Sequence, residues 1–394
     1  MTEGRDGVRT MAGTREPLVD AYCRGVFPGD LGIAAFEAML PGAAAPGSTL
    51  FDSPAGFALR RWCPPLLGLE QHCPPTRYLA RRRELGAFDA VRLLLRGAGI
   101  TGYLVDTGDP GDLTPPRELA AAAGAPAYEL VRLGPLAQQV ADTSGTVDAF
   151  LANVAEAVHG AALRVTGFVC GDDGEDGGAA GYPGMYGDTR PPGPDEVRRA
   201  AARWLGGRVI RERPRDPVLL RHLRWHAVAT GLPLVLRYAA AGPGPRADEG
   251  FLRAVAGVGT DVVLLPGAPH EAAPHEAAAA ELAASQPHVY VAVSADPAAV
   301  LARTPFGKVL YAGAGAGLPE LYVAAAGQFR AALDRAVAAR VDAGEWSAAD
   351  GQRVAALVGA GNARRVYRLP DPVGGAALPA QRSGLLAAGL GIEH

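Results

Sequence analysis

The chain has 394 residues, with 52 glycines, 33 prolines and a formal net charge of −3. That length suits an α/β barrel with insertions, and the near-neutral charge excludes a strongly basic binder of nucleic acid or of an anionic membrane. Four cysteines without a CxxC pair exclude a disulfide framework and argue against a structural zinc. No segment resembles a signal peptide or reaches membrane-spanning length, so we expect a cytoplasmic protein. Abundant Ala, Gly and Arg with a single lysine, Lys308, indicate a GC-rich bacterial genome.

Short apolar runs, typical of buried strands, alternate with amphipathic or Ala-rich stretches, typical of helices. The runs lie at 17–23, 100–106, 127–133, 163–169, 232–238, 261–266, 288–293 and 308–313. Helical patterns between them include 146–160, 195–206, 216–230 and 274–285. This repeated alternation predicts the α/β class, as a (β/α)8 TIM barrel that spans residues 16–369.

Four segments fall outside the alternation. Residues 1–15 carry no apolar pattern and are predicted to be disordered, and translation could start at Met1 or at Met11. Residues 46–83 are too long and too apolar for a loop, so we predict an early inserted subdomain over the barrel mouth. Residues 171–194 are rich in Gly, Asp and Pro and are predicted to form a flexible lid loop. Residues 370–394 are predicted to be a flexible tail.

Several motifs carry a resemblance to a known family. They are "LVDAYCRGVF" (18–27), "GSTLFDSPAGFALRRWCPPLLGLE" (47–70), "YLVDTG" (103–108), "DPVLLRHLRWHAVATGLPL" (216–234), "PFGKVLYAGAGAGLPELY" (305–322) and "GAGNARRVYRL" (359–369). Together they resemble the metal-dependent amidohydrolase superfamily, in the branch found beside or fused to glutamine-synthetase-like enzymes. The resemblance implies a TIM barrel and a metal held by ligands on strands one, four, five, six and eight.

The resemblance assigns each of those metal ligands to a position in this sequence. At every one of these positions the residue type differs from the ligand that the family has there. They fall on Tyr22 and Arg24 for strand one, Thr166 for strand four, Arg237 for strand five, Pro266 for strand six and Ala314 for strand eight. A catalytic zinc needs at least three converging donor side chains and an open position for water. Arginine cannot lose its proton to become a ligand, and it repels a dication. We therefore predict that the protein has no metal or other cofactor, and that the family's hydrolytic mechanism is lost.

The same positions suggest an anion site. Arg24 and Arg237 would point to one place at the barrel mouth, where two guanidiniums could bind a carboxylate or phosphate. Arg132 on strand three could add a third positive charge. The alternative is that Arg24 and Arg237 pair with internal acids such as Asp20 or Asp106 and only fill the vacated site, and that Arg132 is a solvated residue at the rim.

Tyr22 and Cys170 each have a chemical and a structural interpretation. Beside two cations the pKa of the Tyr22 phenol is expected to fall, which would suit acid–base work; alternatively its ring fills the space of a histidine and a metal. Cys170, at the end of strand four, could be a nucleophile, although a small core residue is the more common role. The predicted site has Tyr22, Arg24 and Arg237 as its catalytic residues. Its predicted substrate-binding residues are Asp106, Arg132, Thr166 and Cys170.

Three functions remain open at this point. The first is a repurposed, metal-independent enzyme that acts on a small anionic metabolite in a bacterial biosynthetic pathway. The second is a catalytically inactive homologue, a pseudoenzyme, kept as a ligand-binding or partner protein. The third, least favoured, is a metal-dependent amide hydrolase. The partners considered are a small anionic molecule, a glutamine-synthetase-like enzyme and a second copy of the chain.

Overall fold

The computed structural model describes residues 16–108, 111–171, 189–210, 212–239, 242–267, 275–313 and 315–370. Eight parallel strands form one sheet in sequence order. They are β1 (Leu18–Cys23), β2 (Ile100–Asp106), β3 (Ala127–Arg132), β4 (Gly167–Gly171), β5 (Leu234–Tyr238), β6 (Val262–Pro266), β7 (Val289–Val293) and β8 (Val309–Tyr311). Backbone hydrogen bonds from Arg24 to Gly315 and from Phe27 to Gly317 bring the ends of β1 and β8 together. The predicted (β/α)8 barrel is confirmed.

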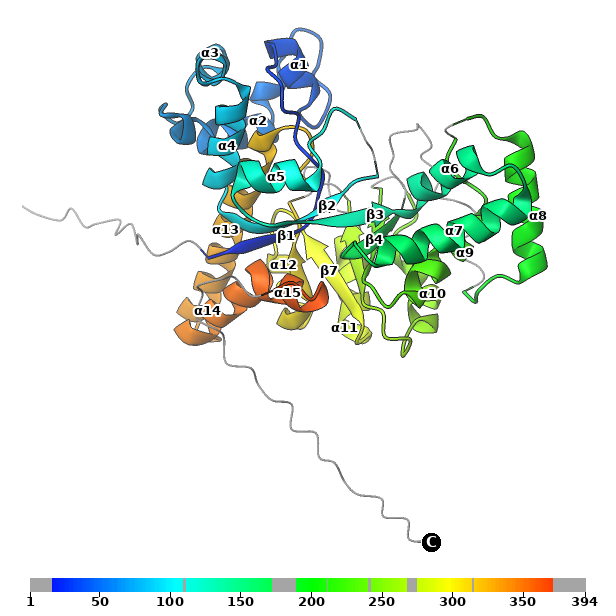
Figure 1. Cartoon of the computed structure of the whole chain (residues 1–394). Helices are drawn as coiled ribbons and strands as arrows, with labels where there is room; N and C mark the ends of the chain where they lie inside the picture. Colours follow the sequence, from blue (N-terminus) through cyan, green and yellow to red (C-terminus); the bar gives the residue numbers. More distant parts are fainter. Residues whose placement is uncertain are drawn as a thin grey trace, which may run out of the picture.

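Helices surround the strands (Figure 1). The α-helices are α1 (Ile33–Ala38), α2 (Pro54–Trp62), α3 (Pro75–Leu85), α4 (Ala87–Gly97), α5 (Pro116–Ala123), α6 (Leu133–Thr143), α7 (Val147–Ala162), α8 (Pro194–Gly207), α9 (Pro217–Ala229), α10 (Glu249–Ala254), α11 (Glu276–Ser285), α12 (Ala298–Leu301), α13 (Pro319–Asp342), α14 (Ala348–Ala356) and α15 (Asn362–Val366). Short 3-10 turns are η1 (Leu50–Asp52), η2 (Pro64–Leu67), η3 (Pro245–Asp248) and η4 (Phe306–Lys308), and η5 (Leu357–Gly361) is a π-helical turn. No helix in the described part is long and apolar enough to cross a membrane.

The core has two layers, as the alternation of side chains in a strand requires. One set of strand residues, including Leu104, Leu130 and Val235, packs inside the barrel. Val366 and Tyr367, at the end of α15, belong to the same cluster and close the barrel floor. The other set packs outward against the helices and forms the larger cluster.

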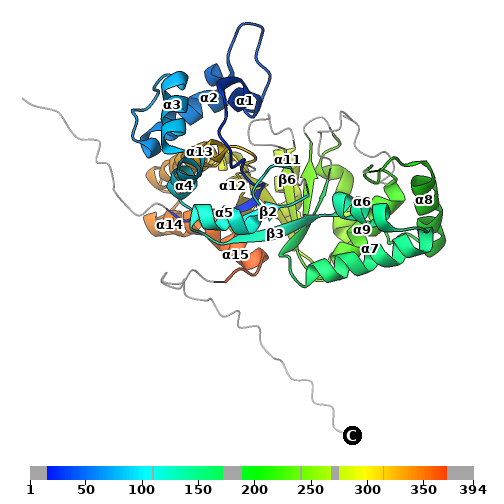
Figure 2. The same ribbon diagram turned by 45° about the horizontal axis from the view of Figure 1, so that its top comes forward.

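Residues 46–83 contain η1, α2, η2 and most of α3, and these helices gather with α1 beside the barrel in both views (Figures 1 and 2). A fully buried carboxylate, Glu320 at the start of α13, fixes this segment. Its Oε1 accepts hydrogen bonds from the Tyr78 hydroxyl at 2.9 Å and from Arg82 Nε at 3.0 Å. Glu320 belongs to the "GLPELY" motif, so that motif anchors α3 to the barrel.

Other predicted segments fall mainly outside the described residues. They are the N-terminal extension at 1–15, most of the lid loop at 171–194, and the tail after Pro370. Strand four differs from its prediction because Thr166 and the residues before it belong to the turn after α7, where Leu163 is 87% exposed. The strand therefore begins at Gly167 rather than at 163.

Candidate functional site at the barrel mouth

The inner face of the barrel changes from apolar to charged toward the carboxyl ends of the strands. Side chains alternate between the two faces of a strand, so the residue two positions after an inward-facing residue also faces inward. Asp106 follows Leu104 in this way, Arg132 follows Leu130, and Arg237 follows Val235. Because parallel strands end at the same edge of a barrel, these three side chains meet at its mouth.

Asp106 is the centre of a buried hydrogen-bond network. Its Oδ2 accepts the Tyr22 hydroxyl at 2.6 Å, Arg132 Nε at 2.9 Å and Arg132 Nη2 at 2.5 Å. Its Oδ1 accepts the backbone N–H of Gly108 at 2.8 Å. The side chains of Asp106 and Arg132 are 0% and 3% exposed, so the pair is a desolvated salt bridge. Removing one partner of such a pair typically costs about 3–5 kcal/mol.

Tyr22 reaches this network because β1 is irregular. The pairing of β1 with β2 shifts register between Asp20 and Cys23. As a result Ala21 and Tyr22 both pack with the inner cluster, while Cys23 packs with the outer one. Strict alternation would not have placed Ala21 and Tyr22 on the same side.

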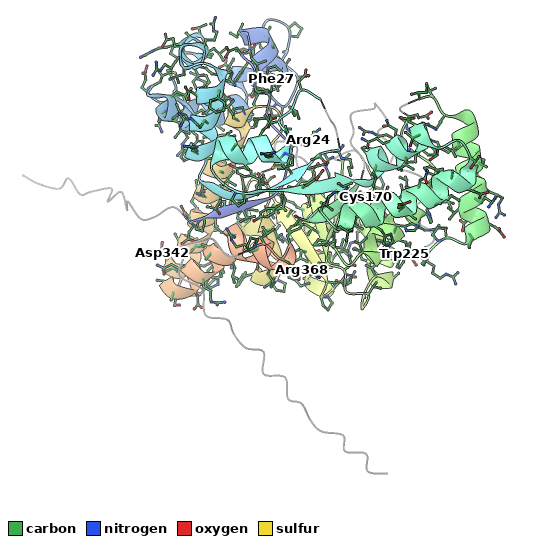
Figure 3. All side chains as sticks on the ribbon, viewed as in Figure 1. Arg24, Phe27, Cys170, Trp225, Asp342 and Arg368 are labelled. Carbon is green, nitrogen blue, oxygen red and sulfur yellow. The ribbon has the colours of Figure 1, made fainter. Side chains whose placement is uncertain are left out.

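Arg237 lies over the Tyr22 ring, with its guanidinium carbon 5.1 Å from the ring centroid, a cation–π distance. Arg24 follows β1 at the point where the chain leaves the barrel toward α1 (Figure 3). Its backbone N–H donates to Gly315 O at 2.8 Å, and its backbone oxygen accepts the Tyr322 hydroxyl. The structure therefore joins Tyr22, Asp106, Arg132 and Arg237 in one group, with Arg24 next to it along the chain.

The predicted lowering of the Tyr22 pKa is wrong. Burial raises the pKa of the phenol well above its usual value, and the nearby Asp106 charge raises it further. Arg237 and Arg132 act in the opposite direction but do not compensate. Tyr22 is therefore a neutral phenol, and its hydroxyl donates a hydrogen bond to Asp106 Oδ2.

Two glycines make the arrangement possible, and the sequence analysis did not recognise their role. A Cβ on Gly108 would lie 2.5 Å from Arg132 Cβ and 2.8 Å from its Nε. A Cβ on Gly171, which has φ of +152°, would lie 2.3 Å from the backbone oxygen of Arg237. Only glycine lets the chain pass this close to the two arginines. The position of Gly108 two residues after the acidic end of a predicted strand, in "YLVDTG", was the signal in the sequence.

Three other assigned positions lie elsewhere. Thr166 precedes β4 at its amino end, so it does not belong to the mouth, and the inward residue at the carboxyl end of β4 is Gly171. On β6 the inward residue is Leu265, which packs with the inner cluster, and the next residue, Pro266, falls on the outer face. Ala314 lies outside the described residues.

Cys170 packs with the outer cluster, where it joins a second buried network. Its Sγ accepts Arg224 Nε at 3.3 Å, and Arg224 Nη1 donates to Asp248 Oδ1 at 2.6 Å. The Tyr238 hydroxyl completes the network by donating to Asp248 Oδ2 at 2.9 Å. This network links β4 and β5 to α9, which gives Cys170 a structural position between the barrel and a helix.

Asp20 is a third buried group, on the outer side of β1. Its Oδ1 accepts the backbone N–H of Gly313 at 2.8 Å and that of Tyr22 at 3.3 Å. Its Oδ2 and the hydroxyls of Tyr103 and Tyr311 have no hydrogen-bond partner within the described part of the chain. Burial raises the pKa of Asp20 to about 7, although its two backbone hydrogen bonds oppose the change.

The mouth does not fit a divalent metal. As they stand, no three or more His, Cys, Asp or Glu side chains in the described ranges are arranged together to hold one. The Asp106 oxygens already accept four hydrogen bonds, and the neighbouring Arg132 and Arg237 repel a cation.

No protein-family model matches the chain, and no curated protein matches it. Solved structures do. A proposed metal-dependent hydrolase from Lactobacillus casei aligns with a TM-score of 0.72 and 19% identity, covering 90% of this chain and 96% of that one. A uronate isomerase from Bacillus halodurans aligns with a TM-score of 0.59 and 12% identity, covering 91% and 94%. A uronate isomerase from Thermotoga maritima aligns with a TM-score of 0.60 and 11% identity, covering 89% and 94%.

These similarities are of fold, because the identities are too low to carry an activity across. They extend over nearly the whole chain. The chain therefore shares the fold of these three structures.

Proposed function

We propose that the barrel mouth binds a small anionic molecule, a carboxylate or phosphate, and acts on it without a divalent metal. The supporting observation is the charge at the inward positions, where Arg132 and Arg237 gather near Asp106 and Tyr22. Asp106 pairs with Arg132, Arg237 lies over the Tyr22 ring, and Arg24 follows β1 next to this network. A guanidinium in a partly desolvated site binds carboxylate or phosphate through charge-assisted hydrogen bonds.

The solved structures of similar fold support a carboxylate as the ligand. Two of them are uronate isomerases, and a uronate carries a carboxylate. At its barrel mouth this chain has the arginine side chains Arg132 and Arg237. We infer that the anion of the ligand is bound by Arg237 and Arg24.

In the enzyme proposal, Tyr22 and Asp106 form the proton-handling pair. Their oxygens lie 2.6 Å apart, so a proton can pass between them without rearrangement. Arg132 fixes the orientation of the Asp106 carboxylate through two hydrogen bonds to Oδ2. Arg237, packed on the ring of Tyr22, would bring the bound anion next to this pair.

A second candidate is a binding protein without turnover. The raised pKa of Tyr22 favours it, because a general acid or base works best with a pKa near the operating pH. In this proposal the ligand, or a partner such as a glutamine-synthetase-like enzyme or a second copy of the chain, would be recognised rather than converted.

The experiment is a binding titration with D-glucuronate and with inorganic phosphate as probes. Arg237→Ala should weaken the binding of the preferred anion by roughly 2–5 kcal/mol, the cost of removing one partner of a buried charge pair. Arg353→Ala is the matched control, because Arg353 lies on the outer surface of α14 and pairs with Asp350. Equal affinities of the two variants would contradict the anion site.

A further inference from the structure

Three histidines from two neighbouring helices gather on the outer layer of the barrel, away from its mouth. His222 and His226 lie on α9, and His159 lies on α7; the two helices run side by side (Figures 1 and 2). The rings of His222 and His226 are 4.4 Å apart between centroids and nearly perpendicular, at 86°. The His159 ring lies 6.4 Å from that of His226.

The two α9 histidines have the geometry of a metal-binding pair. They are four residues apart and therefore lie on one face of the helix. Their Nε2 atoms are 3.1 Å apart. Zinc–imidazole bonds are about 2.0–2.1 Å long, and two of them at tetrahedral or octahedral angles place their nitrogens about 2.9–3.4 Å apart. One metal ion can therefore contact both Nε2 atoms with little movement of either ring.

His159 is positioned to become a third ligand. Its Nδ1 lies 3.0 Å from the backbone oxygen of Ala155, one turn earlier on α7. A histidine that donates Nδ1–H to a carbonyl presents the lone pair of Nε2, which is the usual arrangement of a metal-ligating imidazole. Its exposed side chain is free of core packing, so a rotation can bring Nε2 toward the α9 pair.

We propose that His222 and His226 form a site for one divalent first-row transition metal, and that His159 completes the site and braces α7 against α9. Imidazole ligands suit Cu²⁺, Ni²⁺ and Zn²⁺, whereas Mg²⁺ and Ca²⁺ prefer oxygen ligands. Water would fill the remaining positions, because both α9 histidines are only partly buried. The site is independent of the anion proposal, since none of its residues lies at the barrel mouth.

The test is a titration of the full chain, free of any affinity tag, with Cu²⁺ alone, followed by calorimetry and by electron paramagnetic resonance. The wild type should bind one equivalent with coupling to imidazole nitrogen, more tightly than it binds Ni²⁺ or Zn²⁺. His222→Gln and His226→Gln should each weaken binding at least tenfold. His159→Gln should weaken it less, and His72→Gln, at an exposed histidine outside the cluster, should not change it.

Stability provides the second readout, because metal that binds only the folded state raises the urea midpoint. Addition of Zn²⁺ should raise the midpoint of the wild type and of His72→Gln, but not that of His222→Gln. The proposal is overturned if Cu²⁺ does not bind, or if both α9 variants bind it as the wild type does. Either result would mean that the Nε2 contact is only a hydrogen bond between two neutral rings. An unchanged affinity in His159→Gln would overturn the brace between the helices.

Discussion

Replacing Asp20 with asparagine should stabilise the protein, and the gain should grow with pH. The substitution is nearly isosteric, and its side-chain oxygen can still accept the N–H groups of Gly313 and Tyr22. It removes a carboxyl that is fully buried and whose Oδ2 has no hydrogen-bond partner among the described residues. Unlike the aspartate, the asparagine side chain cannot become negatively charged in this buried environment.

The magnitude follows from proton linkage. Burial raises the pKa of Asp20 from 3.8 to about 7. Between these values the folded state binds a proton that the unfolded state has lost, so the free energy of unfolding falls as pH rises. At 1.36 kcal/mol per pH unit, the loss is on the order of 4 kcal/mol once the pH exceeds 7. The contribution of the protonated carboxyl is complete below about pH 4 and is lost as the pH passes through 7.

The assay is urea unfolding of the wild type and of Asp20→Asn at pH 5, 6, 7 and 8, followed by circular dichroism. The variant's advantage should increase steadily with pH and level off above 7. Asp89→Asn is the control, because Asp89 is exposed and pairs with Arg92 on the surface of α4. If the difference between Asp20→Asn and the wild type is the same at every pH, Asp20 ionises normally in the folded state and the reasoning is refuted.

Three further predictions concern single residues. Gly108→Ala should displace the Arg132 side chain, because the new Cβ would lie 2.5 Å from Arg132 Cβ; anion titration should show weaker binding, and unchanged affinity would argue against a role for Arg132. Tyr22→Phe should lower the free energy of unfolding by about 1–3 kcal/mol, since buried Asp106 loses a donor; if the chain is an enzyme, turnover should also fall by roughly 10²–10⁴-fold. In metal-free protein, nuclear magnetic resonance should show His222 protonating near pH 4, because burial, helped by His226, lowers its pKa to about 4. The unfolded state then binds the proton first, so stability should fall as pH drops from 6.5 to 4; a midpoint near 6.5 would contradict this.

The strand–helix alternation was enough to predict the barrel, because each buried strand needs a continuous apolar run and each covering helix needs one apolar face. Strand ends were harder to predict. The run at 163–169 begins in the turn after α7, and nothing in its composition separates the exposed Leu163 from the buried residues of β4. The register shift in β1 was also unpredictable, since it depends on pairing with β2.

The sequence was enough to name the residues of the candidate site, but not to predict which of them pair with each other. Tyr22, Asp106, Arg132 and Arg237 were all named from the sequence, yet Arg132 was predicted to add a positive charge to the anion site and not to pair with Asp106. The two are 26 residues apart, and only the neighbouring positions of β2 and β3 bring them together. The pKa of Tyr22 was predicted in the wrong direction because the neighbouring charges were considered without the larger effect of burial.

The central claim is that the barrel mouth binds an anion without a metal. Its most direct test is calorimetric titration of D-glucuronate and phosphate into protein kept in excess chelator, which also empties the histidine site. The account predicts that one of these anions binds with the same affinity in chelator as in buffer containing Zn²⁺ or Mn²⁺, and that Arg237→Ala abolishes or strongly weakens this binding. Binding that disappears in chelator and returns with added metal would contradict it.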